Sequence, residues 1–454
     1  MIQGSVLNVM DFGASNDGTN AAATTAAIQA ALDAAGDVWF PPGIYAISTS
    51  LNLSTSKRII GGGTSVAYGV ADEIIRTQVR LEMQGNFPCF KNKTGTTGRQ
   101  YNIEGFNIFW ENVTPLAAES ATKGNRYGFY FVADGVANYT APYSTFTDIE
   151  VNGAWQVYYD DTDNYLNKFK SVLGRFCRFG FYKRLGTLMH FEECGNSIGA
   201  QGFHFNNTIS PILVNCAADE LTPDATTPGV AANYFADCKS VSILGWDAEA
   251  AVINGNDYSY MNLTRTYGTI TGFTGLNNSL NCGSGEFVSW FLISDESNIT
   301  ISGFNRKFNS STSYTFAGAS GGTCATVRSI VNARCTVLNS DVRAPSGGTP
   351  DFRYSVFSTG GYSTLIDSVW DNLQTITTRI IDGTIIANDI LALSTFNIGA
   401  VQTVSTAIAA PVSGDYVKNT ILFNQNPSAG GFIGWVCTVS GNPGTWKTFG
   451  AITP

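Results

Sequence analysis

An internal repeat in the middle of the chain constrains the fold more than any other feature of this sequence. The segment Gly180–Phe181 begins 14 positions before Cys194, and Gly202–Phe203 begins 14 positions before Cys216. The two copies are therefore offset by 22 residues. A sequence that reuses a unit of this length is typical of a solenoid, in which each coil contacts only its neighbours.

The next copy of the repeat is longer. Phe205 and Cys216 match Phe235 and Trp246 at an offset of 30 residues, and we assign the extra length to a loop at residues 222–229. The chain has 48 Gly and only 14 Pro. This composition suits many short strands joined by turns in which Gly and Asn take left-handed conformations, so helices should be scarce.

The repeat predicts that Cys194, Cys216 and Trp246 stack in one inward-facing row, with Cys177 as an earlier member. An inward ladder of similar side chains is how a solenoid packs its core, and it accounts for the cysteines without any chemistry. Their number is odd, nine, and no CxxC pair occurs, so we expect neither a disulfide framework nor a zinc site. We expect nine reduced, internal thiols: Cys89, Cys177, Cys194, Cys216, Cys238, Cys282, Cys324, Cys335 and Cys437.

Charge and hydropathy disfavour two classes of partner. The net charge of −9, from 35 acidic and 26 basic residues, disfavours nucleic acid, because a phosphate backbone attracts basic surfaces. No run approaches the roughly 18 to 20 apolar residues that cross a bilayer, so no membrane partner is expected. The first residues lack a charged segment followed by an apolar one, which predicts synthesis in a cytoplasm without a signal peptide.

The N-terminal segment contains the one convincing helix. Residues 21–35 are rich in Ala, with Ile28 and Leu32 on one face and Gly36 as a stop. Short β runs separated by a Pro-Pro-Gly turn follow at residues 38–47.

Three stretches of this segment, VMDFGASNDGTN, AAIQAALDAAG and VWFPPGIYAIS, resemble the N-terminal motif of pectate-lyase-like phage tailspikes. The resemblance covers about the first 60 residues. It implies an all-β chain folded as a right-handed parallel β-helix, assembled as a homotrimer and attached to the tail proteins of a virion. It also implies action outside the cell on a bacterial surface polysaccharide: a capsule, an exopolysaccharide or an O-antigen. No cofactor is expected.

We divide the chain into an N-terminal cap at residues 1–60, a β-helix body at 61–400 and a small C-terminal β module at 411–454. Stretches such as NITISGFN and RIIDGTII keep a β-branched, alternating pattern, which leaves open whether the distal body stays a β-helix or becomes a β-sandwich. The Gly- and aromatic-rich C-terminal residues resemble a small terminal module found on many tailspikes.

Paired carboxylates are the candidate catalytic groups. If the cysteine row points inward, strand alternation turns Asp219 outward on one coil and Asp247 and Glu249 outward on the next. Adjacent coils lie about 4.8 Å apart, so Asp219 beside Glu249 suits the roughly 5 Å separation of a retaining glycosidase, whereas the diagonal to Asp247 is nearer the inverting range. Glu193 continues the outward columns on the preceding coil. Close carboxylates raise one pKa, as a general acid requires. The alternative is a set of solvated acids at coil corners.

The acidic cluster YYDDTDN at residues 158–164 is a candidate for calcium. Asp160, Asp161 and Asp163 offer the hard oxygen ligands that this ion prefers. Leu166 stands where an EF-hand needs a turn Gly, and an ordinary Asp-rich turn explains the cluster equally well. We therefore assign no metal site.

Aromatic residues are the candidate substrate-binding groups. Trp155, Tyr158 and Tyr159 flank the acidic cluster, and aromatic rings of this kind stack on the apolar faces of pyranose sugars. Tyr258 and Tyr260 complete the aromatic part of the candidate set.

Basic residues just before the acidic columns form a candidate strip for an anionic sugar, or the source of a base for a polysaccharide lyase. Arg178 is the member that we assign to substrate binding, and a solvated basic face is the alternative. The strip comprises Arg175, Arg178, Lys183 and Arg184.

Three functions remain open. Only His190 and His204 occur and there is no GxSxG elbow, so a Ser-His-Asp triad has no support. We favour a glycoside hydrolase that depolymerises a polysaccharide by paired carboxylates, with a polysaccharide lyase and a non-catalytic glycan-binding adhesin as alternatives. The fold alone does not choose among them, because function depends on the site.

Overall fold

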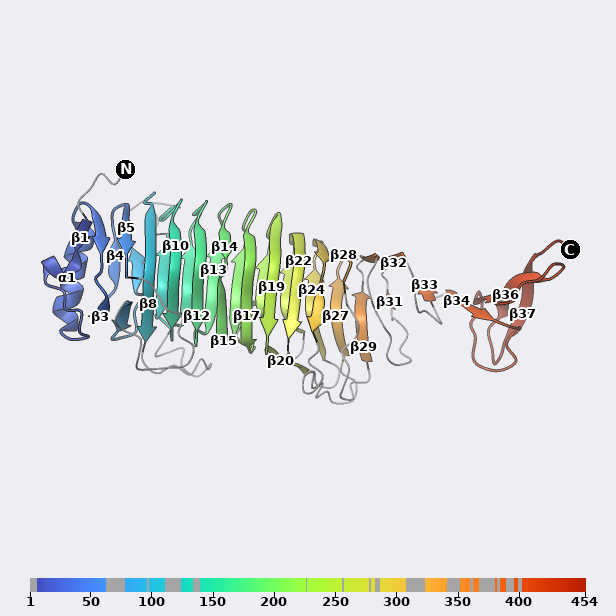
Figure 1. Ribbon diagram of the computed structural model, residues 1–454. Coiled ribbons are helices and arrows are strands. Elements are labelled where there is room, and N and C mark those ends of the chain that lie inside the picture. The colour runs from blue at the N-terminus through green and yellow to red at the C-terminus, as the bar shows by residue number, and fades with distance from the viewer. Residues whose placement is uncertain are drawn as a thin grey trace.

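The chain folds into a parallel β-helix, which the computed structural model shows as short strands stacked along one axis (Figure 1). The structure describes residues 6–62, 78–95, 98–110, 124–133, 139–225, 227–254, 257–276, 279–281, 286–307, 323–340 and 402–454, with the backbone of strands at 352–359, 362–366, 380–381, 384–388 and 396–398.

One long parallel sheet, sheet A, forms one side of the coils. Its longer strands largely alternate between buried positions and positions that are half-buried or exposed, as the repeat predicts for a sheet with one face toward solvent. Its strands are β1 Val6–Asn8, β2 Asp37–Trp39, β3 Gly43–Ile47, β5 Lys57–Ile60, β6 Val79–Met83, β8 Tyr101–Trp110, β10 Thr145–Asn152, β12 Lys168–Arg175, β14 His190–Glu192, β15 Gly195–Gly199, β17 Ile212–Leu221, β19 Val241–Glu249, β22 Tyr267–Leu276, β25 Asn298–Ser302, β26 Asn305–Lys307, β28 Arg334–Leu338, β30 Tyr362–Ile366 and β32 Thr384–Asn388.

A second parallel sheet, sheet B, forms the other side. Each coil runs through one sheet B strand, a turn, and one or two sheet A strands before it returns to sheet B on the next level. The strands of sheet B are β4 Leu51–Leu53, β7 Phe90–Asn92, β9 Tyr127–Val132, β11 Gln156–Asp161, β13 Phe179–Arg184, β16 Gln201–Asn206, β18 Ala231–Ala236, β21 Tyr258–Thr264, β24 Phe287–Ser294, β27 Thr323–Ile330, β29 Phe352–Thr359 and β31 Ile380–Ile381.

The N-terminal end of the stack is covered by helix α1, Ala21–Asp33 (Figure 1). The helix begins where it was predicted and ends two residues earlier. Ile28 and Leu32 lie on its buried face, where they are 0% and 1% exposed. Helix α1 therefore closes an open end of the core that would otherwise present apolar side chains to water.

On five successive coils, sheet A bends at one residue with a left-handed backbone. On successive coils Asp148, Ser171, Glu193, Asn215 and Gly245 have φ values of 50°, 51°, 55°, 50° and 64°. The strand register stacks these residues in one column. The bend separates sheet A on each of these coils into a first half and a second half that face in different directions.

The inward-facing row predicted from the repeat is confirmed. Cys216 pairs with Trp246, as the 30-residue offset requires. Leu173 pairs with Gly195, so Val172, not Cys177, is the member of the row that precedes Cys194. The prediction for Cys177 is wrong because that residue lies after the end of β12, in the turn that leads to sheet B.

The cysteines that the structure describes are buried and free. They are Cys89, Cys177, Cys194, Cys216, Cys238, Cys335 and Cys437. Burial raises the pKa of the Cys177 and Cys216 thiols to about 12, so these groups are protonated at neutral pH. The side chains of Cys282 and Cys324 lie outside the described residues.

The distal strands continue the stack. β25, β28, β30 and β32 pair in parallel, so the β-helix extends at least to Asn388. A small, largely antiparallel sheet follows at the opposite end from α1 (Figure 1). Its strands are β33 Phe396–Ile398, β34 Gln402–Ala407, β35 Ile421–Asn424, β36 Phe432–Val439 and β37 Thr445–Ala451. Among the described residues, no helix has the length and apolar character needed to span a membrane.

Candidate functional site

The candidate catalytic carboxylates lie on the outward face of β17 and β19, after the bend. Ala218 and Ala248 are completely buried, so the residues beside them face outward. Asp219 is half-buried, whereas Asp247 and Glu249 are exposed. The predicted orientation of all three side chains is therefore confirmed.

Asp219 and Glu249 lie next to each other on adjacent coils. Ala217 pairs with Asp247, and the same offset of 30 residues places Asp219 opposite Glu249. The backbone N–H of Glu249 donates to Oδ1 of Asp219 at 3.0 Å. One oxygen of the carboxyl group is thus fixed by the neighbouring coil.

The pKa of Asp219 is raised to about 7, chiefly because the carboxyl group is buried. The charges of Asp247, Glu249 and Glu220 raise it further, while the hydrogen bond from the Glu249 amide acts in the opposite direction. Asp219 therefore keeps its proton to a higher pH than an ordinary aspartate, a property that a general acid requires.

The column that contains Asp219 carries small residues on the preceding coil. Gly195 pairs with Ala217, and Ser197 pairs with Asp219. Glu193 is not part of this column, because it occupies the left-handed bend in line with Asn215. Its Oε2 accepts a hydrogen bond from Ser171 Oγ at 3.0 Å. The prediction that Glu193 continues the outward columns of the carboxylates is wrong, because the bend intervenes.

Tyr260 lies inside the coil behind Asp219, and the prediction that it contacts substrate is wrong. Its side chain is 0% exposed, its hydroxyl donates to the carbonyl oxygen of Ala218 at 2.8 Å, and it accepts from Trp246 Nε1 at 3.0 Å. Tyr260 supports the strand that carries Asp219 from within.

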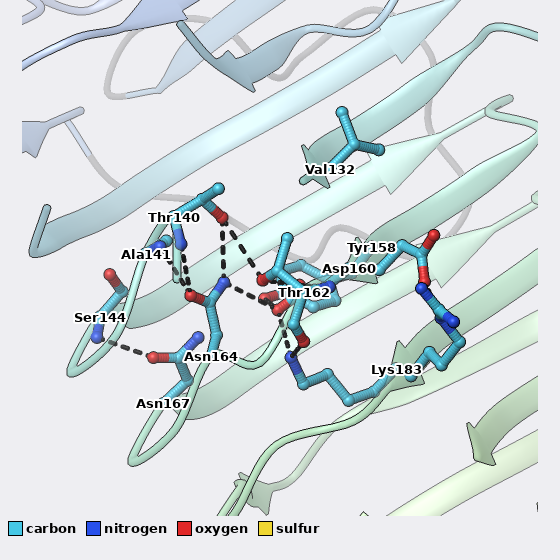
Figure 2. A network of polar contacts seen from close by, with 12 residues as sticks. Val132, Thr140, Ala141, Ser144, Tyr158, Asp160, Thr162, Asn164, Asn167 and Lys183 are labelled. Carbon is cyan, nitrogen blue, oxygen red and sulfur yellow. Dashed lines mark hydrogen bonds and ion pairs between the residues drawn. The ribbon is translucent and has the colours of Figure 1, made fainter. Parts of the chain in front are cut away.

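The acidic cluster is an internal network (Figure 2). Asp160 and Lys183 are both 0% exposed and form an ion pair at 2.8 Å. Oδ1 of Asp160 also accepts from the backbone N–H and hydroxyl of Thr162, and Oδ2 accepts from Asn164 Nδ2 and the Tyr158 hydroxyl. Both oxygens of Asp160 are engaged, so the calcium interpretation fails at this residue.

The same network corrects two further predictions. Tyr158 is 1% exposed, so it packs in the core instead of forming a sugar platform. Lys183 is internal, and burial lowers the pKa of its ammonium group while Asp160 opposes that shift. Arg184 pairs with Asp161. These residues do not form the predicted basic strip.

Arg178 has a structural role, in which it connects a loop to the core. Its side chain is 4% exposed, and its Nη2 donates to Asp224 Oδ2 at 2.8 Å, which ties the loop after β17 to the core. Its guanidinium carbon lies 5.1 Å from the ring centres of Trp155 and Phe179. The assignment of Arg178 to substrate binding is therefore wrong, and one side of half-buried Trp155 is covered.

Two of the predicted aromatic contacts remain at the surface. Tyr159 is half-buried on the outward face of β11, and Tyr258 is half-buried at the start of β21. Burial, with the charges of Asp224 and Glu286, raises the pKa of the Tyr258 hydroxyl. The described residues include no group of three or more His, Cys, Asp or Glu arranged to hold a metal ion.

Comparison with known proteins agrees with this architecture. A family model described as rhamnogalacturonase A/epimerase, pectate lyase-like, matches residues 6–154. The gp42 tailspike of Acinetobacter phage vb_AbaP_AS12 is similar in structure, with a TM-score of 0.52 and 11% identity over 94% of this chain and 72% of that chain. The chain therefore has a parallel β-helix fold, and its first third matches a pectate lyase-like family model.

Other solved structures are less similar to this chain. Tailspike protein 3 of bacteriophage CBA120 has a TM-score of 0.40 and 9% identity, over 98% of this chain and 68% of that chain. An A-module of a mannuronan C-5 epimerase of Azotobacter vinelandii has a TM-score of 0.38 and 14% identity, over 78% of this chain and 98% of that chain. No curated protein matches the sequence.

An outward column of aromatic side chains on sheet B was not predicted from the sequence. Tyr182 and His204 directly follow the repeated residues Phe181 and Phe203, so the 22-residue offset already places them side by side. Tyr159 pairs with Tyr182 on the coil before. The signal was present in the repeat, one position after the buried phenylalanines.

Proposed function

We propose that this chain is a phage tailspike depolymerase that hydrolyses glycosidic bonds of a bacterial surface polysaccharide. The observation that carries the proposal is the pKa of Asp219, raised to about 7 on a coil whose neighbour presents two more outward carboxylates. Relatives in fold include proteins named as tailspikes, which supports a location on a virion tail and action outside the host cell.

The proposed mechanism assigns Asp219 as the general acid. Protonated Asp219 transfers its proton to the oxygen of the leaving sugar, while a carboxylate on the next coil acts from the other side of the bond. Glu249 is the proposed nucleophile, because residues on adjacent coils lie about 4.8 Å apart, near the roughly 5 Å of retaining enzymes. Asp247, on the diagonal, is the proposed base if the enzyme inverts.

The test replaces Asp219 by Asn and, separately, Glu249 by Gln and Asp247 by Asn. Asn at 219 keeps an oxygen that accepts from the Glu249 amide, so the fold is preserved while the proton is lost. We expect Asp219→Asn to lower kcat by at least about 10², because proton transfer contributes roughly 10² to 10⁴. Glu192→Gln is the matched control, since Glu192 is an outward acid of sheet A that pairs with Lys170 before the bend.

The readout separates the alternatives. Purified capsular and O-antigen polysaccharides are incubated with the protein, and reducing ends and ultraviolet absorbance are followed. A hydrolase produces reducing ends without absorbance, a lyase produces an absorbing unsaturated sugar, and an adhesin produces neither. Wild-type activity in Asp219→Asn would contradict the proposed site, and an absorbing product would contradict hydrolysis.

We also propose that the chain is a homotrimer. Large apolar side chains lie exposed on successive turns between sheet B and sheet A, and we call them the apolar ridge: Tyr143, Leu166, Leu188 and Ile209. They are 37% to 49% exposed. Exposed apolar residues aligned along one edge favour contact with another protein surface, and other copies of this chain are the proposed partners.

A further inference from the structure

One outward column of sheet B is aromatic over five consecutive strands, from β9 to β18. The strand register stacks its members directly, one on each coil. All are half-buried, while the residues beside them in the strands, such as Phe181 and Phe203, are buried in the core. We call this set the tyrosine column: Tyr130, Tyr159, Tyr182, His204 and Tyr234.

Tyr130, Tyr159 and Tyr182 stack face to face, whereas His204 meets Tyr182 edge-on with planes 79° apart and Tyr234 is tilted by 42° to His204. Tyr130 and Tyr159 have ring centres 5.2 Å apart and planes 22° apart, and Tyr159 and Tyr182 have values of 4.7 Å and 15°. His204 continues the column at 4.8 Å from Tyr182. Burial lowers the pKa of His204 to about 4, so the column is uncharged at neutral pH. It presents apolar edges together with groups that donate and accept hydrogen bonds.

A hollow lies at each end of the tyrosine column. At the N-terminal end, Asn52, Lys91 and Tyr130 pair in register and help to line a hollow of about 520 Å³. The side chains of Gln29 and Asp33 complete part of its wall. The column thus begins in a polar hollow beside helix α1.

The other hollow, also about 520 Å³, lies where the same column reaches Asn262, Leu292 and Arg328. Its second wall is formed by Ala225, Thr227, Gly229 and Val230. From β4 to β27 the column crosses ten strands, a length of about 43 Å at about 4.8 Å per strand.

The wall of the second hollow is held in place by hydrogen bonds. Asn262 Nδ2 donates to the carbonyl oxygen of Gly229 at 3.0 Å, and Gln201 Nε2 donates to that of Pro228 at 3.0 Å. Arg328 Nη1 donates to Asp257 Oδ1 at 2.6 Å. The hollow therefore combines a fixed loop and apolar side chains with a paired cation and carboxylate, which suits a neutral, hydroxyl-rich ligand.

We propose that the outward face of sheet B, from β4 to β27, is an extended binding track for a largely neutral polysaccharide chain. The track is separate from the carboxylates on sheet A, and the inference rests on the proposed glycan-binding function. A linear polymer fits a column that runs along the axis, with uncharged hydroxyl edges between two polar hollows. The apolar ridge, at another edge of the coils, is the better surface for a second copy of the chain.

The test uses the polysaccharide from the panel that the wild-type protein binds, partly hydrolysed and separated by length. Wild-type affinity should increase with chain length. Tyr159→Ala combined with Tyr182→Ala should weaken binding of the longest fraction by at least about tenfold, or about 1.4 kcal/mol, and weaken binding of the shortest fraction less. Tyr267→Ala is the matched control, because Tyr267 is 46% exposed at the start of β22 in sheet A.

A second variant removes the outward hydroxyl groups without disturbing the stack. Tyr159→Phe combined with Tyr182→Phe keeps both rings, and we expect it to weaken binding of long chains as well, by a smaller factor. Unchanged affinity in both double variants, or wild-type affinity that does not depend on length, overturns the track while the proposed function stands.

Two further outcomes also overturn the track. If the double variants change the molar mass in light scattering but keep wild-type affinity, the face is a contact between subunits. If the wild-type protein binds no polysaccharide of the panel, the track fails together with the proposed function.

Discussion

Asp219 illustrates at the scale of one residue how a solenoid alters an ordinary carboxyl group. Its position on one coil and the position of Glu249 on the next follow from the 22- and 30-residue offsets, so their adjacency could be predicted from sequence. The extent of burial could not, because it depends on how far the neighbouring strand and loop cover the carboxyl group. That burial is the first cause of the raised pKa.

Catalysis should depend on the protonation of Asp219. As the pH rises through about 7, the general acid loses its proton, so kcat/KM should fall on the alkaline side. A pH profile of polysaccharide cleavage measures this limb, and the residual activity of Asp219→Asn should lack it. An alkaline limb of the same midpoint in Asp219→Asn would assign the titration to another group.

Stability should depend on the same proton. Because the folded pKa of Asp219 lies above the ordinary carboxyl value, its contribution to stability is complete below about pH 4 and is lost as the pH rises through about 7. We therefore expect Asp219→Asn to unfold at a higher temperature than wild type at pH 8. The difference should disappear at acid pH, where both side chains are neutral. Thermal unfolding at the two pH values checks the sign.

The buried pair of Lys183 and Asp160 should be costly to break. Lys183→Met leaves the Asp160 carboxylate without its cation in a dry network, which typically costs about 3 to 5 kcal/mol of unfolding free energy. Chemical denaturation measures the loss, and adding Asp160→Asn should recover part of it. A single variant as stable as wild type would show that the pair is hydrated.

The inward position of Lys183 could have been predicted from the sequence. Side chains two residues apart on a strand share a face, so Lys183 points inward with Phe181 and does not belong to an outward basic strip.

At the scale of the element, stacked rings along the axis hold one coil to the next. Phe169 packs between Phe146 and Phe191, with ring centres 4.8 Å and 4.5 Å apart and planes within 8° and 6°. Each ring buries one of its faces against the coil before and the other against the coil after. Neighbouring coils are thus joined by side-chain contacts as well as by backbone hydrogen bonds.

Removing one ring should destabilise the stack locally. We expect Phe169→Ala to lower the free energy of unfolding by about 3 to 5 kcal/mol, because it leaves a cavity between two fixed rings. Phe176→Ala is the control, since Phe176 is 39% exposed and should change the stability little. Denaturation curves compare the two. Equal effects would mean that the core relaxes around the missing ring.

Sequence patterns specified some elements well and others poorly. The Ala-rich helix and the row containing Cys216 and Trp246 follow from composition and period. The bend was hard to predict, because Ser171 and Glu193 occupy it on two coils, although Asp148, Asn215 and Gly245 on the others are residue types that favour a left-handed conformation. The prediction that Tyr260 faces outward failed for a related reason. Tyr260 aligns with the small residues Gly202 and Ala232 on earlier coils, so its ring fills interior space that they leave empty. Alternation along a strand does not predict such a change of side-chain size within the core.

At the scale of the whole molecule, the apolar ridge should determine assembly. We expect the wild-type protein to be a trimer in light scattering, and Leu188→Asp to reduce the molar mass to that of one chain, because it places a charge in an apolar contact. Leu244→Asp is the control, since Leu244 is 42% exposed on sheet A, away from the ridge. A stable wild-type monomer would contradict the trimer.

The loop after β17 lengthens one coil without changing how its strands pair with those of the neighbouring coils. Gly195 pairs with Ala217 at an offset of 22 residues and Ala217 with Asp247 at 30, yet the strands keep the same ladder. The additional residues thus lie in the loop between β17 and β18, beside both the carboxylates and the second hollow. A different segment in this loop would change the surface beside the carboxylates while the stacked strands stay unchanged. Grafting another segment into this loop is therefore a direct way to alter ligand recognition under the proposed function without redesigning the core.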